Sequence, residues 1–255
     1  MCRLAAFPPG YSRDKAIDIL LNFEDFNTDG TGYSYVKDGE FVVEKWAKSL
    51  SKVLKQNDFL THMPYDGWTI AHLRAASHGE KLRRNTHPFV TSKYCICHNG
   101  IWSDYKIAKL ALKDRIEFKG ETDSEVAAQL IDLIGPAEFA KEMDFAGTYL
   151  VLQRDGKLWA LKTSGDLEMK NLRKGGVLIA SEFDDEMVKN AIDVCRGWFF
   201  FDNQGHYLDH EKTGESYSYI PKKYHVSTCA TENNCSSAVK DYSTADEYYR
   251  AYGSI

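Results

Sequence analysis

The sequence predicts an α+β protein in which antiparallel sheets pack against helices. Apolar runs of strand length occur in pairs joined by Asp-Gly at residues 38–39 and 155–156. This dipeptide favours the tight turn of a β-hairpin, because both turn positions need positive φ. Hairpins of this kind alternate with pairs of helical segments, and that order indicates antiparallel sheets rather than βαβ winding.

Within the first hundred residues the sequence carries signals for a helix and four strands. Apolar side chains recur at helical spacing over residues 13–22. The hairpin around Asp38-Gly39 joins strands at 32–38 and 39–46. Residues 68–77 are expected to form a buried strand that runs into a polar loop, and 93–100 a strand that ends at Asn-Gly.

A capping box marks the next helix. Thr122 and Glu125 have the spacing in which a hydroxyl and a carboxylate satisfy the first free N–H groups of a helix. This helix should run to about Ile134 and stop at Gly135-Pro136. The remaining expected elements are a helix at 136–143, strands at 146–153 and 157–163, a strand at 176–182, a helix at 184–194 and a closing hairpin at 198–210.

Composition excludes several classes of protein. The chain has 255 residues, 43% of them apolar, enough for one sizeable domain or two small ones. A formal net charge of −5 gives no electrostatic reason to expect nucleic acid as a partner. No apolar run approaches the roughly 20 residues that span a bilayer, and the N-terminus lacks a signal peptide's apolar segment. Six sparse cysteines without a CxxC pair favour a cytoplasmic, reduced protein.

The C-terminal segment has a different character. We expect the main domain to occupy residues 2–221 and a polar tail to occupy 222–255. The tail ends in a short tyrosine-rich helix with a capping signal at Thr244 and Glu247. This segment is a frayed tail or packs onto its own domain, and docking to a partner protein is the alternative.

One segment resembles a calcium loop without completing it. Asp25, Asn27, Asp29 and Gly30 match the first half of an EF-hand loop. The twelfth position, which should supply a bidentate glutamate, is Val36, and the stretch that follows is strand-like. We therefore expect no metal here.

Cys2 and three polar clusters carry the chemistry. The clusters are HLRAASHG at 72–79, CHNG at 97–100 and ETDSE at 121–125. Taken singly, each has a structural interpretation: an ion pair of the arginine, a plain turn at Asn-Gly, and a first-turn carboxylate favoured by the helix dipole.

Taken together, Cys2 and these clusters resemble the class II glutamine amidotransferases of the N-terminal-nucleophile (Ntn) hydrolase superfamily. That family carries an N-terminal Cys, then H-x-R-x-A-[ST]-H-G, then H-N-G, then E-T-D-[ST]-E, and all four appear here in order. The loop at 27–33 also looks like a family segment that leads into an early strand. The resemblance covers Cys2 to about residue 210. It implies a four-layer α/β/β/α sandwich of two antiparallel sheets, and no cofactor.

The resemblance also implies catalytic roles. The Cys2 thiolate would attack the side-chain amide of glutamine, and its own α-amine, freed by removal of Met1, would carry the proton. An α-amine has a pKa of roughly 7.7–8.0, which suits proton shuttling near neutral pH. Asn99 and the N–H of Gly100 would stabilise the oxyanion. If Met1 stayed attached, the free amine would not exist and the molecule should be inactive.

The same resemblance assigns substrate-binding residues. Arg74 would clamp the substrate carboxylate and Asp123 would receive its ammonium group. Ser77 and His78 match the polar lining of that pocket. The residue after the arginine is often a large aromatic in this family, whereas Ala75 stands here and should widen the pocket.

Three functions are consistent with these motifs. The first is a glutaminase domain that supplies ammonia to a separate synthase or synthetase, because few residues remain for an acceptor domain. The second is a stand-alone hydrolase of other γ-glutamyl amides. The third is a non-catalytic regulatory subunit, which the intact set of motif residues argues against. The segment at 162–171 lacks an arginine and proline pattern that many relatives carry.

Overall fold

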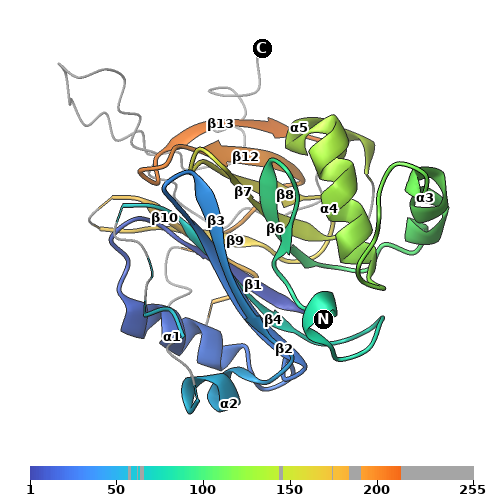
Figure 1. Cartoon of the computed structure of the whole chain (residues 1–255). Helices are drawn as coiled ribbons and strands as arrows, with labels where there is room; N and C mark the ends of the chain where they lie inside the picture. Colours follow the sequence, from blue (N-terminus) through green and yellow to red (C-terminus); the bar gives the residue numbers. More distant parts are fainter. Residues whose placement is uncertain are drawn as a thin grey trace.

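Two stacked sheets form the centre of the molecule, with helices on both outer faces (Figure 1). The structure is a computed structural model that describes residues 1–56, 59–61, 63, 66–143, 146–173, 175–183 and 191–213. Among the helices of this described part, none is long and apolar enough to cross a membrane.

Within the described residues the first sheet has seven strands, and every pairing in it is antiparallel. From edge to edge they are β11 (Ala191–Asp193), β9 (Glu168–Asn171), β10 (Val177–Ala180), β1 (Arg3–Phe7), β4 (Thr69–Arg74), β2 (Gly30–Lys37) and β3 (Glu40–Trp46). The N-terminal strand β1 therefore lies in the middle of the sheet.

The second sheet has six strands in the part of the chain that the structure describes, again antiparallel throughout. In order they are β13 (Tyr207–Lys212), β12 (Gly197–Phe201), β8 (Leu158–Lys162), β7 (Thr148–Gln153), β6 (Tyr94–Asn99) and β5 (Phe89–Val90). The helices are α1 (Arg13–Asn22), α2 (Leu50–Leu54), α3 (Tyr105–Leu112), α4 (Asp123–Ile134), α5 (Pro136–Glu142) and the 3₁₀ turn η1 (Arg83–Asn85).

Three apolar cores hold the layers together, and strand β1 shows how. Side chains of a strand point alternately to its two faces. Ala5 and Phe7 pack towards α1 and α2, whereas Leu4 and Ala6 pack into the core between the two sheets. A third core lies between the second sheet and helices α4 and α5. These layers confirm the predicted α+β class with two antiparallel sheets.

Most of the expected elements are present, with one clear error. The helix predicted at 184–194 is wrong at its end, because Ala191–Asp193 form strand β11, paired with β9. Residues 184–190 lie outside the described residues, as does the predicted tail at 222–255. An edge strand of three residues is defined by its neighbour in the sheet, and local helical periodicity cannot reveal that neighbour.

The capping box at the start of α4 is only half formed. The Thr122 hydroxyl accepts the N–H of Glu125 at 3.3 Å, as predicted. The Glu125 carboxylate does not return to Thr122. It accepts instead from the N–H groups of Lys119 and Gly120, at 2.8 and 2.7 Å. The start of the helix is thereby fastened to the segment that precedes it.

Candidate active site

Four strand ends of the first sheet meet where the chain begins. Cys2 directly precedes β1, and the pairing of Arg3 with Leu73 places Arg74, the last residue of β4, beside it. Strand β2 starts opposite Arg74 at Gly30, and β10 ends beside the start of β1. The sheet topology thus brings Cys2 and Arg74 together from positions more than seventy residues apart.

The Cys2 thiol lies 3.5 Å from the carbonyl oxygen of Ala75. Burial raises the pKa of this thiol, and the nearby positive charge of Arg74 only partly opposes that rise. Cys2 is therefore a protonated thiol at neutral pH, and an attack by its sulfur needs a base to remove the proton.

Asn99 reaches the same place from the second sheet. It is the last residue of β6 and is 4% exposed. Its Nδ2 donates to the Ser181 hydroxyl at 3.4 Å, and the same hydroxyl accepts the N–H of Leu4 at 3.0 Å. Its Oδ1 has no hydrogen-bond partner among the described residues. Ser181 therefore connects Asn99 to strand β1.

Sequence reasoning did not single out Ser181. The available signal was its position directly after the buried apolar run of β10. A polar residue at the end of a buried strand has to find a hydrogen-bond partner there.

Gly100 is a glycine because two backbone segments touch at this point. A Cβ at Gly100 would lie 2.5 Å from the carbonyl oxygen of Ala146 and 2.6 Å from the Cα of Gly147. Gly147 has the reciprocal constraint, since its own Cβ would lie 2.4 Å from the carbonyl oxygen of Asn99. The Asn99-Gly100 turn is fixed by this close packing.

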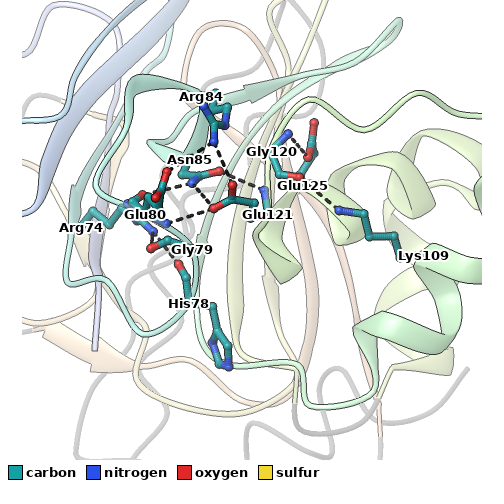
Figure 2. A network of polar contacts seen from close by, with 10 residues as sticks. All are labelled: Arg74, His78, Gly79, Glu80, Arg84, Asn85, Lys109, Gly120, Glu121 and Glu125. Carbon is teal, nitrogen blue, oxygen red and sulfur yellow. Dashed lines mark hydrogen bonds and ion pairs between the residues drawn. The ribbon is translucent and has the colours of Figure 1, made fainter.

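Arg74 organises the loop that follows it (Figure 2). Arg74 is 2% exposed, and its guanidinium donates to the carbonyls of His78, Gly79 and Glu80 at 2.6, 3.3 and 3.0 Å. Burial lowers the pKa of Arg74, while the neighbouring Cys2, Asp29 and Asp123 act in the opposite direction. Arg74, which the sequence predicts to bind the substrate carboxylate, therefore also stabilises this loop through two of its guanidinium nitrogens.

Ser77 and His78 lie on that loop, and both are exposed. The Ser77 hydroxyl and Nδ1 of His78 are 3.2 Å apart, and the His78 ring meets Tyr105 of α3 edge-on at 6.1 Å. These two side chains are open to solvent beside the buried Arg74, as a rim of the site would be.

Asp123 begins helix α4 and is 5% exposed. One carboxylate oxygen accepts the N–H of Trp102 and the other the N–H of Ser124, each at 2.9 Å. Within the described part of the chain no cationic side chain forms an ion pair with it. A buried carboxylate in this state is suited to receive an external cation.

Three histidines lie buried behind these residues. Nε2 of His72 donates to the carbonyl of His98 at 2.9 Å, directly before Asn99. His98 contacts the Ser124 hydroxyl through Nδ1 and the carbonyl of Ala146 through Nε2. The His87 ring lies 3.8 Å from that of His72. Burial lowers the pKa of all three, that of His72 to about 3, so the cluster is neutral at neutral pH.

The calcium-like segment has a structural task. Asp29 accepts the N–H of Ala76 at 2.9 Å and pairs with Lys81 at 2.5 Å, so it supports the loop after Arg74. The residues after it form strand β2, as the sequence predicts. Within the ranges that the structure describes, no three His, Cys, Asp or Glu side chains form a metal-binding group.

Residues 23–143 match the family described as "Glutamine amidotransferases class-II". This stretch, just under half of the chain, is similar to the class II glutamine amidotransferase domain. The match includes Arg74, Asn99, Gly100 and Asp123. Cys2 lies outside the matched residues. It lies beside Arg74 because it directly precedes β1, which pairs with β4.

Individual relatives agree with this family. The glutamine–fructose-6-phosphate aminotransferase [isomerizing] of Aquifex aeolicus is 33% identical over 139 residues, which are 51% of this chain and 22% of the relative. The match thus spans about a fifth of that enzyme's length. Glutamine phosphoribosylpyrophosphate amidotransferase from B. subtilis shares the fold with a TM-score of 0.67 at 17% identity, over 83% of this chain and 49% of the other. A class-II glutamine aminotransferase domain protein from Silicibacter pomeroyi gives 0.51 at 14% identity, over 84% and 100%.

Proposed function

We propose that this chain hydrolyses the side-chain amide of L-glutamine to glutamate and ammonia, with Cys2 as the nucleophile. The observation that carries this proposal is the meeting of Cys2, Asn99 and the two buried charges, Arg74 and Asp123, at one end of the sheets. The family match and the aminotransferase and amidotransferase relatives support the same reaction class.

The reaction follows from the state of the thiol. Because the pKa of Cys2 is raised, the thiol has to lose its proton as its sulfur attacks the amide carbon. The α-amine of Cys2, once Met1 is removed, accepts that proton. Asn99 Nδ2 and the N–H of Gly100 stabilise the tetrahedral oxyanion. The α-ammonium then returns the proton to the leaving nitrogen, which departs as ammonia and leaves a thioester that water hydrolyses.

Substrate recognition uses the two opposite charges. Arg74 faces the α-carboxylate with the donor capacity that its loop contacts leave, and Asp123 accepts the α-ammonium. Ser77 and His78 form the exposed rim. No metal or cofactor takes part in this scheme.

The ammonia acceptor is proposed to be a separate synthase or synthetase. Affinity capture of the full-length protein, followed by mass spectrometry of the retained proteins and an ammonia-transfer assay with each, tests this part. Equal transfer with an unrelated protein would remove the support for a specific acceptor.

A second candidate, hydrolysis of larger γ-glutamyl amides, rests on Ala75. Its carbonyl contacts the Cys2 thiol, and its side chain is a methyl group where relatives often place an aromatic ring. An assay of glutamine against a panel of γ-glutamyl amides, with wild-type protein and an Ala75→Trp variant, separates the two. Glutamine should be the better substrate, and a bulky amide that outcompetes it only in wild-type protein would favour the second candidate.

The central test combines intact mass with activity. Active protein should have lost Met1 and should release glutamate, and Cys2→Ala should abolish this release. Cys2→Ala protein with full activity would refute the nucleophile, and inactive wild-type protein without Met1 would favour the regulatory-subunit alternative.

A further inference from the structure

Asn85 is a buried side chain between the two segments that support the proposed charge sites. It ends the 3₁₀ turn η1 and has 0% exposure. On one side lies the loop after Arg74, and on the other the segment of Gly120 and Glu121 (Figure 2), which leads into helix α4.

The Asn85 amide uses both of its donor hydrogens and its oxygen on these two segments. Its Nδ2 donates to the carbonyl of Glu80 at 3.0 Å and to the Glu121 carboxylate at 3.2 Å. Its Oδ1 accepts the N–H of Glu121 at 2.9 Å. A buried amide that makes three hydrogen bonds fixes the relative position of the groups that it joins.

The chain of contacts continues to the charges themselves. The carbonyl of Glu80 that accepts from Asn85 also accepts from Arg74, at 3.0 Å. The N–H of Glu80 donates to the Glu121 carboxylate at 3.1 Å, which ties the loop to this segment a second time. Glu121 stands two residues before Asp123. Arg74 and Asp123 are thus connected through Asn85.

The surrounding backbone approaches Asn85 so closely that glycine occupies both sides. A Cβ at Gly79 would lie 3.0 Å from its Nδ2, and one at Gly120 would lie 2.8 Å from its Oδ1. A side chain at either glycine would therefore displace the Asn85 amide.

We propose that Asn85 is a positioning residue that sets the separation between the carboxylate-binding Arg74 and the ammonium-binding Asp123. In this proposal Asn85 contacts neither the substrate nor Cys2. The inference rests on the proposed function. Its effect is specific for substrates that carry both charges, because only these have to match the separation of the two sites.

The test compares L-glutamine with 4-carbamoylbutanoate, which keeps the amide and the carboxylate but lacks the α-amino group. Loss of the Asn85 amide should penalise the substrate that engages both sites, since displacements of about 1 Å cost up to about a hundredfold. We expect Asn85→Ala to lower the kcat/KM preference for glutamine over the analogue about tenfold, mainly through KM for glutamine.

Two further variants make the result decisive. Glu121→Ala removes an exposed side chain that holds the same loop, and it should change the preference in the same direction even if Asn85→Ala does not fold. Arg84→Gln is the control, because it breaks the exposed ion pairs of Arg84 with Glu121 and Glu80, at 2.8 and 3.5 Å, and removes no group that Asn85 contacts. It should keep the wild-type preference.

The outcomes are distinct. Equal losses on both substrates in Asn85→Ala and Glu121→Ala would show a merely structural role and overturn the inference. Wild-type protein without Met1 that hydrolyses neither compound would refute the proposed function, and the inference with it. A preference that falls in both variants and stays in Arg84→Gln supports the inference.

Discussion

Lowering the pH from about 7.5 to about 5 should destabilise the protein through its buried histidines. The unfolded chain protonates His72 near its ordinary pKa of 6.5, whereas the folded state resists protonation down to about 3. Between these values the unfolded state binds more protons, so stability is complete above the ordinary pKa and is lost as the pH falls.

The size of this loss of stability follows from the lowered pKa of His72. One pH unit within this window is worth about 1.4 kcal/mol, so about 1.5 units below the ordinary pKa remove about 2 kcal/mol. The pKa values of His87 and His98 are also lowered by burial, and their contributions have the same sign. The positive charges of Lys45 and Arg74 further disfavour protonation of His87, whereas Asp123 favours it at His98.

Urea unfolding at both pH values measures this loss. A His72→Gln variant keeps an N–H near the position of Nε2 and cannot titrate, so it should show about 2 kcal/mol less pH-dependent loss than wild-type protein. His206→Gln is the control, because the His206 ring is exposed beside Asp202. Stability that does not change between the two pH values, or a His72→Gln variant with the full loss, would refute the reasoning.

Three further predictions concern the site. Arg74→Ala and Asp123→Ala should mainly raise KM for glutamine, whereas Asn99→Ala should lower kcat by about 10²–10³. The reason is that only Asn99 meets charge that develops in the transition state. Steady-state kinetics in which Asn99→Ala mainly raises KM and the other two variants mainly lower kcat would contradict these roles. Ser181→Ala should lower kcat less than Asn99→Ala does. It should also lower the free energy of unfolding by about 1–3 kcal/mol, since the main-chain N–H of Leu4 in β1 loses its acceptor. An unchanged free energy of unfolding in urea would count against this. Gly100→Ala should destabilise by about 1–3 kcal/mol because its Cβ meets a main-chain oxygen at 2.5 Å, and an unchanged Tm would argue against that packing.

Local signals in the sequence predicted the elements whose causes are local. The Asp38-Gly39 turn needs positive φ at both residues and has it, at 52° and 75°. The helix that starts after Thr122 runs to Ile134, as its cap and its stop signal predict. Each of these features depends on a few consecutive residues.

Features that depend on distant partners were missed. Strand β9 has a short, mixed sequence and exists because β10 and β11 pair with it. Ser181 contacts Leu4 and Asn99, and Asn85 contacts Glu121, across separations of 36 to 177 residues. A single sequence shows that these side chains are polar, but it does not show which groups they meet.

The central position of strand β1 has a practical consequence for preparing the protein. The proposed base is the amine of the residue directly ahead of this strand, and the strand is held on both sides by β4 and β10. An affinity tag fused ahead of Cys2 would convert its α-amine into a peptide amide, while the rest of the fold stayed intact. On the proposed mechanism, such a fusion would give a folded protein that binds glutamine without hydrolysing it and is suitable for trapping the substrate complex. Tags for activity measurements belong at the opposite terminus.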